Sequence, residues 1–434
     1  MAWPLTLKTI MLHGIVVIDA ILVSSLGETA VAAMGIASVF GGLLLGILGA
    51  FSNGTQIRLA QAFGAADPAA LRTGFLCGLL INGCIALAGI GAAFLAGELI
   101  VDRVAHSAWI GTEAKNYLSV LLLVFLAEAV ALNLSSLFNA RGETRVPFLS
   151  YLVSLPVNVG VSYILIHGHF GAPEMGVTGA AWGTVVGAVL RLSVLVREAR
   201  RSGILKAGQK TRQRNAFAAA LRRHFLFTLP IAATFASASL ANAVATLIYA
   251  ALSVTEFAAL TLMMPWIMVV GAIAMCWAQA TGILVAQLIG ERRSGSDLDA
   301  FLGSAWRAAF GAAVLVSLVY LAVCLLSGRI YPGLNEDTRA ALLGFLPVLL
   351  LLPFPKVSNA MCGNTLRAGG ETVYVMHIFI WSQWAFRLPA TALLVLVFNA
   401  PVIWIFSLLL FEELVKLLPF HLRLLSGKWK TGRL

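Results

Sequence analysis

The residues that could do chemistry in this sequence are a few acids and bases inside long apolar segments. Asp19 lies near the middle of an apolar stretch at 10–31, which is long enough to cross a bilayer as a helix. A carboxylate at that depth costs roughly 2.5–3.5 kcal/mol on insertion scales, so it normally faces a polar cavity and has a function. The alternative is a carboxyl group that is held neutral, or hydrogen-bonded to a neighbouring helix, for packing alone. We interpret Asp19 as a functional group at the edge of a cavity.

Glu128 is a second acid near the middle of an apolar segment, at 117–138. Two carboxyl groups in one poorly solvated pocket cannot both ionise cheaply, so one of them is expected to hold a proton. Asp19 and Glu128 are therefore predicted to form a pair that loads and unloads protons. Glu128 could instead point to Arg387 or to a backbone group, because the sequence does not orient its helix.

Four bases also lie within apolar segments: Lys356, Arg387, Arg58 and Arg191. We expect Arg387 to hold helices together by bonding to backbone carbonyls. Arg58 and Arg191 lie towards the ends of their segments, where the side chains are expected to snorkel to the membrane surface. The sequence contains no metal-ligand spacing, phosphate-binding glycine loop or nucleophile elbow, so no metal, ATP-driven or hydrolytic chemistry is predicted.

The composition indicates an all-α, polytopic membrane protein. Hydrophobic residues make up 60% of the chain and charged residues 11%, whereas about a quarter of residues are charged in soluble domains. Segments long enough to span a bilayer predict twelve transmembrane helices, six on each side of a polar stretch. They lie at 10–31, 36–59, 74–97, 117–138, 146–167, 175–197, 225–251, 258–289, 305–326, 344–364, 373–398 and 401–424. We predict an N-terminal six-helix lobe at 1–197, a basic cytoplasmic linker at 198–224, and a C-terminal lobe with a short basic tail at 225–434.

Short motifs recur between the two predicted lobes. The Ala-Gln-x-x-Gly motif at 60–64 returns at 286–290, and the Gly-Glu-Thr motif at 142–144 returns at 370–372. An even number of spans separates the copies, so both lobes cross the membrane in the same sense. Parallel repeats of this kind are related by a pseudo-two-fold axis along the membrane normal, and they favour a binding site between two rocking lobes. A duplicated scaffold without transport is the alternative.

The net charge of +11 is explained by membrane topology. Basic residues gather at 197–223 and in the C-terminal tail, so the positive-inside rule predicts that both termini and the linker are cytoplasmic. No basic groove with interleaved aromatic residues is evident, so nucleic acid is not an expected partner. The expected partners are the lipid bilayer and a small organic molecule, and we expect a monomer without a cleavable signal peptide.

Several of these segments together resemble the multidrug and toxic compound extrusion (MATE) family. The resemblance rests on the aspartate-centred segment at 18–27, the end of the second helix at 54–65, the Arg-Gly-Glu-Thr turn at 141–144, the Phe-Arg-Leu-Pro signature at 386–389 and the tail at 427–429. It implies cation-coupled efflux of organic cations by rocking of two six-helix lobes. It also implies that the first-helix aspartate, Asp19, has polar partners on helices four, five and six, which here are Asn133, Asn158 and Thr184.

The sequence departs from the family pattern in the C-terminal lobe. Some members bind sodium there through acids on helices seven and ten, but the segment at 225–251 has no acid and the tenth has Lys356. Proton coupling is therefore expected, with sodium left open at the N-terminal site. We expect the Lys356 ammonium to act as a built-in cation, partnered by carbonyls freed at Pro353 and Pro355 or by a helix from the same lobe. The alternative is a lysine that snorkels towards the cytoplasm.

The sequence thus predicts a secondary-active transporter of the bacterial cytoplasmic membrane, without a cofactor, that exports amphipathic, cationic compounds against proton entry. The predicted coupling residues are Asp19, Asn158, Thr184 and Asn133, with Glu128 as an auxiliary acid. A flippase for lipid-linked precursors is the nearest alternative, although it would favour a strongly basic cavity. A polytopic membrane transferase is a further alternative, but the loops are too short and too poor in acids and histidines for a catalytic cluster.

Overall fold

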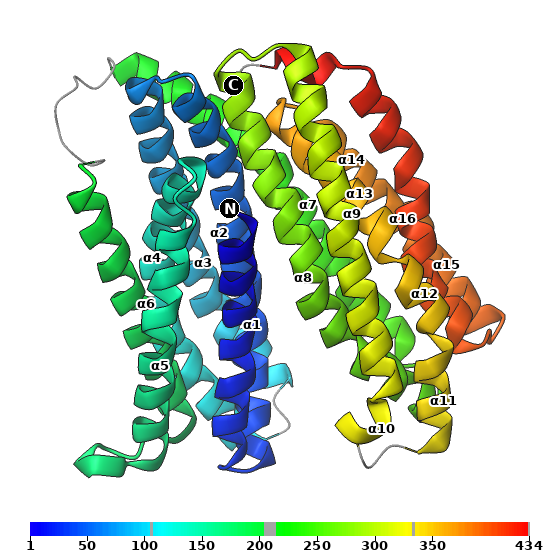
Figure 1. The fold of residues 1–434 in the computed structure, drawn as a ribbon. Coiled ribbons are helices and arrows are strands. Elements are labelled where there is room, and N and C mark those ends of the chain that lie inside the picture. Colours follow the sequence, from blue (N-terminus) through cyan, green and yellow to red (C-terminus); the bar gives the residue numbers. More distant parts are fainter. Residues whose placement is uncertain (105–106, 204–213, 332–334, 433–434) are drawn as a thin grey trace. The chain divides into compact units, whose positions relative to one another are not determined.

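The computed structural model describes residues 1–104, 107–203, 214–331 and 335–432, and every regular element in these ranges is a helix. The chain divides into two compact units. The first comprises Trp3–Phe63 and Asp67–Ala232, with Met1 (Figure 1). Its helices are α1 (Ala2–Ser24), α2 (Glu28–Gly64), α3 (Pro68–Val104), α4 (Ala108–Ala140), α5 (Arg145–His167), η1 (His169–Gly171), α6 (Gly176–Arg201) and the first part of α7 (Arg214–Tyr249).

The second unit comprises Ala233–Leu434 together with Ala2 and residues 64–66. It contains the rest of α7 and a series of long and broken helices. These are α8 (Val254–Gly290), α9 (Gly295–Leu325), α10 (Ser327–Ile330), α11 (Glu336–Gly344), α12 (Leu346–Leu351), α13 (Pro353–Ala368), α14 (Thr372–Trp381), η2 (Ser382–Arg387), α15 (Leu388–Ala392), η3 (Leu393–Val397), α16 (Val402–Leu425) and η4 (Lys428–Thr431).

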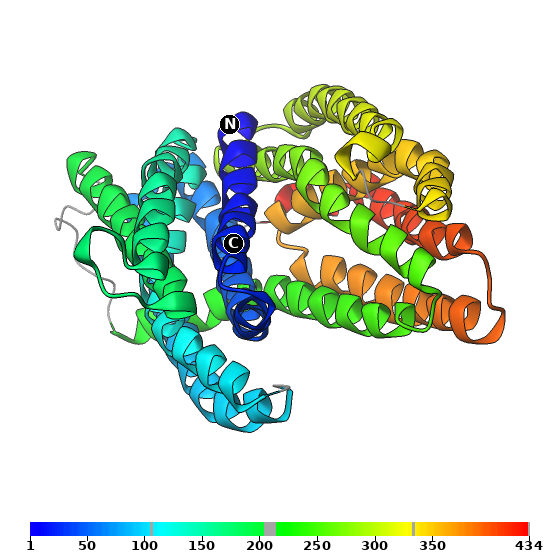
Figure 2. The same ribbon diagram turned by 90° about the horizontal axis from the view of Figure 1, so that it is seen from below.

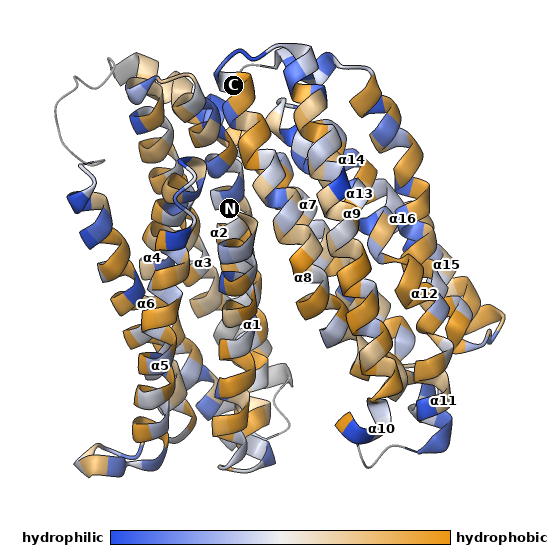
Figure 3. Cartoon of the chain, viewed as in Figure 1, coloured by the Kyte–Doolittle hydropathy of each residue, from blue (hydrophilic) through white to orange (hydrophobic). Residues whose placement is uncertain are grey.

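The prediction of an all-α membrane protein is confirmed. Among the described residues, ten helices are long and apolar enough to cross a membrane, and the bent segment α11–α13 makes an eleventh candidate. Helix α16 has 24 residues, but Glu412, Glu413 and Lys416 interrupt its apolar sequence. The twelve predicted segments fall on these ten helices, on the bent segment and on α16. Figure 3 shows hydrophobic residues along the helices of both units and hydrophilic ones at α10 and α11.

Each unit is a bundle of helices, seen end-on in Figure 2. Each bundle has its own hydrophobic core. Leu48, Phe125 and Val177 are among the core residues of the first unit. In the second unit, the rings of Phe345 and Phe406 stack with their centroids 4.1 Å apart.

Prolines lie at two irregular places of the second unit. The helix bends by 43° between α12 and α13, where Pro353 cannot donate a helical hydrogen bond. The span that contains α14 and α15 includes two π-helical stretches, η2 and η3, with Pro389 between them. Because proline lacks the backbone N–H, the helix widens around it, and η2 presents Ser382, Gln383 and Arg387 to the interior of this unit.

The boundary between the two units lies within α7, at residues 232 and 233. The predicted linker at 198–224 precedes this boundary. Its residues 204–213 lie outside the described residues, and α7 begins at Arg214 within its remaining part.

Candidate functional site

Asp19 is the only charged residue that α1 buries. Its side chain lies against the first unit and is 6% exposed, while its neighbours Val16, Val17 and Ile21 are all more than half exposed. The helix therefore turns its acid inward and its aliphatic side chains outward. This orientation fits a membrane helix, because lipid accommodates aliphatic side chains and a carboxyl group needs polar neighbours.

Asp19 is within hydrogen-bond distance of Thr184 on α6, and Thr184 in turn contacts Asn158 on α5. The Thr184 hydroxyl lies 3.4 Å from Asp19 Oδ2, and the Asn158 amide nitrogen lies 3.4 Å from Thr184 Oγ1. The same hydroxyl is 3.1 Å from the carbonyl oxygen of Ala180. Since a threonine hydroxyl has one proton, it can serve only one of these two acceptors at a time.

Three buried oxygen atoms in this cluster have no hydrogen-bond partner in the described structure: Asp19 Oδ1, Asn158 Oδ1 and Ser162 Oγ. Buried polar atoms are nearly always paired, so unpaired ones at one place indicate a ligand or a transferable proton. Two of the three atoms are pure acceptors when Asp19 is ionised. The cluster is therefore suited to a proton or another cation.

Glycines of α6 bring Thr184 and Asn158 together. A Cβ atom on Gly183 would clash with the Ser162 hydroxyl and would lie 2.8 Å from Ser162 N and 2.9 Å from the carbonyl oxygen of Asn158. Gly179 lies equally close to the backbone of α5 at Leu165. Small residues at such contacts let membrane helices approach closely.

We expect Gly183→Ala to separate α5 from α6 and to weaken the Asn158–Thr184 contact. Overpacking of this kind typically costs about 1–3 kcal/mol of stability. The thermal unfolding temperature in detergent should therefore fall, together with the transport rate. Gly160→Ala on α5 is the matched control, because nothing lies within 4 Å of a Cβ atom there. Equal unfolding temperatures for the two variants would contradict this account.

Asn133 does not belong to this cluster. It is fully buried on α4 and donates from its amide to the carbonyl oxygen of Phe75 on α3, at 3.1 Å. Its observed contact therefore joins α3 to α4. Asn133 was selected because the resemblance to the family implies a polar partner of Asp19 on helix four. The resemblance does not say on which face of that helix the partner lies.

Glu128 pairs with Arg191, and this contact replaces both of the partners considered from the sequence, Asp19 and Arg387. The Arg191 guanidinium donates to the Glu128 carboxylate and to the Tyr151 hydroxyl, and it lies over the Tyr151 ring at 4.4 Å. Arg191 is 3% exposed, so the expectation that it snorkels to the surface is wrong. The opposite charges of Glu128 and Arg191 at similar depth, counted from the ends of α4 and α6, were the sequence signal for this pair.

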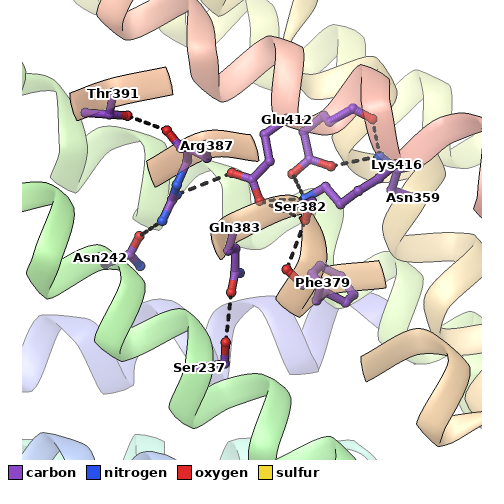
Figure 4. Close-up of polar contacts among 11 residues, drawn as sticks. Ser237, Asn242, Asn359, Phe379, Ser382, Gln383, Arg387, Thr391, Glu412 and Lys416 are labelled. Atoms are coloured by element: carbon purple, nitrogen blue, oxygen red, sulfur yellow. Dashed lines mark hydrogen bonds and ion pairs between the residues drawn. The ribbon is translucent and has the colours of Figure 1, made fainter. Parts of the chain in front are cut away.

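The second unit contains a buried ionic network that the sequence analysis missed. Arg387 donates to Asn242 Oδ1 at 2.8 Å and forms an ion pair with Glu412 at 3.4 Å, so the expected bonds to backbone carbonyls are wrong (Figure 4). Lys416 bridges Glu412 at 3.2 Å and Glu413 at 2.9 Å. The sequence signal was a Glu-Glu-x-x-Lys pattern inside an apolar segment.

Lys356 is half-buried near the start of α13, close to this network. Its ammonium makes no hydrogen bond or ion pair with any residue that the structure describes, so the expected carbonyl partners at Pro353 and Pro355 are absent. The charges that act on it are those of Glu413, Lys416, Glu412 and Arg387. It lies outside the Asp19 cluster, in the other unit.

The apolar helices and the inward-facing carboxyl group together define a multi-pass membrane protein of the transporter class. The family model MatE matches residues 4–164 and 230–406, which is most of the chain. The chain therefore belongs to the multidrug and toxic compound extrusion family, whose members are transporters of small molecules. The expectation drawn from the resemblance is confirmed at the level of the family.

Two curated relatives and a solved structure match nearly all of the chain at low identity. The uncharacterized transporter YisQ of Bacillus subtilis is 21% identical over 390 residues, covering 90% of this chain and 85% of the relative. A probable multidrug resistance protein NorM of Thermotoga maritima is 25% identical over 410 residues, covering 88% of this chain and 82% of the relative. The fold is similar to that of the eukaryotic MATE transporter AtDTX14, with a TM-score of 0.85 at 16% identity over 100% of this chain and 95% of that chain.

Proposed function

We propose that this chain is a proton-coupled antiporter that exports amphipathic, cationic organic compounds. The observation that carries the proposal is Asp19, a buried carboxyl group with one unpaired oxygen beside Thr184 and Asn158. The names of relatives such as the probable multidrug resistance protein NorM of Thermotoga maritima support export of drug-like compounds.

The chemistry of the Asp19 cluster suits alternation between a proton and an organic cation. A carboxylate in this apolar surrounding is stabilised by any cation that binds it, and a proton is the smallest. Proton binding from the outside would neutralise Asp19 and release a bound organic cation. The parallel repeat of the sequence supports rocking of two lobes as the transport movement. A proton entering down the membrane potential supplies about 2.3 kcal/mol per 100 mV.

The charge distribution supports a topology with both termini in the cytoplasm of a bacterial cell, in its inner membrane. The basic residues near 197–223 and in the tail would then face the anionic inner leaflet. We propose that the monomer is the transporting unit, since the internal repeat supplies both lobes from one chain.

We expect transport to follow a proton gradient and not a sodium gradient, because both acids of α16 are already paired with fixed bases. In proteoliposomes, a tenfold sodium gradient and a pH gradient of one unit carry the same free energy, about 1.4 kcal/mol. Uptake of a fluorescent organic cation should be fast only with the pH gradient. Equal rates under the two matched gradients would contradict proton coupling.

A further inference from the structure

Arg191 follows a row of glycines along which α6 packs against α5. Gly179, Gly183 and Gly187 precede it at intervals of four residues. All three lie close to α5, and a Cβ atom on Gly187 would be 2.9 Å from the Cβ atom of Asn158. Glycines let two membrane helices approach closely, but they offer no side chain that interlocks with the neighbour. The row itself therefore does little to fix the rotation of α6.

The Arg191 guanidinium reaches from α6 to both neighbouring helices. It donates to the carboxylate of Glu128 on α4 and to the hydroxyl of Tyr151 on α5, and all three residues are buried. A guanidinium is a planar fork whose N–H groups point in fixed directions, so acceptors on two helices fix its orientation. Since the fork is carried by α6, these two contacts also limit how far α6 can rotate.

Thr184 lies on the same side of α6 as Arg191, seven residues earlier and thus two turns, or about 10 Å, away. Helix α6 has 26 residues and contains no proline, so a rotation at Arg191 is carried to Thr184. The Thr184 hydroxyl is 3.4 Å from both Asp19 Oδ2 and the amide nitrogen of Asn158. Both distances are long for hydrogen bonds, which weaken steeply beyond about 3.2 Å. A small displacement of α6 therefore decides whether Thr184 can donate to Asp19.

We propose that Tyr151 and Glu128 act through Arg191 to hold Thr184 within hydrogen-bond distance of Asp19. Tyr151 is then a positioning residue for coupling, although it does not touch the coupling site. This inference rests on the proposed proton coupling and adds a second cluster to its machinery. The competing account is that the cluster stabilises the first unit without affecting the Asp19 site.

Tyr151→Phe is the informative variant, because it keeps the ring under the guanidinium and the ion pair with Glu128 and removes one acceptor. Dye uptake by proteoliposomes is measured at a series of imposed pH gradients. The rate should fall roughly three- to tenfold, since the bond from Thr184 to a charged group is weakened but not lost. Tyr163→Phe, at an exposed tyrosine of the same helix, is the matched control and should not change the rate. Tyr117 on α4, another titratable group near the coupling carboxyl group, is unchanged in both variants.

Combination with Thr184→Val separates positioning from a structural role. If Tyr151 acts through Thr184, the double variant should transport no more slowly than Thr184→Val alone. Both single variants should also move the pH of half-maximal transport in the same direction, and the double variant no further than Thr184→Val. Losses that multiply, with an unchanged pH profile in Tyr151→Phe, would overturn the proposal, and so would an unchanged rate in Tyr151→Phe.

Arg191→Lys is the second variant should Tyr151→Phe not fold, because it keeps the charge but loses the fork. It should behave as expected for Tyr151→Phe, both alone and combined with Thr184→Val. If neither variant folds, the cluster has a structural role and the proposal is overturned. A Thr184→Val variant that transports as fast as the unmodified chain would instead contradict the proposed coupling site itself.

Discussion

Asp19→Asn should reduce proton-driven transport to the level of empty proteoliposomes while the protein still folds. The amide keeps the size of the side chain and can still contact Thr184, so the packing of α1 against the first unit is preserved. It cannot bind and release a proton, and it cannot attract an organic cation by charge. Transport is measured as dye uptake under an imposed pH gradient, and folding as the thermal unfolding temperature in detergent.

Glu28→Gln is the matched control for this substitution, because Glu28 is an exposed acid at the start of α2. It should retain the transport rate of the unmodified chain. If Asp19→Asn also retained that rate at equal protein amount, Asp19 would have a packing role alone.

Glu128→Gln should destabilise the first unit strongly. It leaves the Arg191 guanidinium, which is 3% exposed, without its counter-ion in the interior. Removing one partner of a buried ion pair typically costs roughly 3–5 kcal/mol, mostly because the other charge stays buried and unpaired. The measurement is the thermal unfolding temperature in detergent, together with the yield of folded protein.

Two further variants test whether the unpaired charge is the cause. Replacing Glu128 and Arg191 together by leucine should recover much of the lost stability, because no lone charge remains. Glu291→Gln removes one partner of the exposed Arg293–Glu291 pair, at 2.9 Å, and should leave the unfolding temperature almost unchanged. A Glu128→Gln variant as stable as Glu291→Gln would show that the buried pair contributes little.

The helices and the Asp19 cluster could be predicted from the sequence, for clear physical reasons. Spans of apolar residues identify membrane helices without reference to their neighbours, because lipid is the solvent for all of them. An acid in the middle of such a span is rare enough to be noticed alone. Asn158 and Thr184 were predicted from the resemblance to the family. In the structure Thr184 lies within hydrogen-bond distance of Asp19, and Asn158 lies within hydrogen-bond distance of Thr184.

The partners of most other charged residues could not be predicted from the sequence. The position of a residue in an apolar segment gives its depth in the membrane, but not the direction in which its side chain points. Glu128 was assigned to Asp19 on depth, whereas α4 turns it towards Arg191 on α6. Asn133 was likewise on the expected helix and on another face. In the second unit, the acids of α16 and their pairing with Lys416, three and four residues further on, could have been predicted from the sequence. The pairing of Glu412 with Arg387 could not, because it depends on the widened helix at η2.

Thr184 has a single hydroxyl proton, so its hydrogen bond depends on whether Asp19 on α1 is ionised. When Asp19 is ionised, its carboxylate is the stronger acceptor and the Thr184 hydroxyl donates to it. When Asp19 is neutral, the hydroxyl donates to the carbonyl oxygen of Ala180 within α6. The two choices exclude each other, but a neutral carboxyl group can in turn donate its own proton to Thr184 Oγ1. The contact between α1 and α6 is therefore kept in both ionic states, and the charge on Asp19 decides the direction of the hydrogen bond between the two helices.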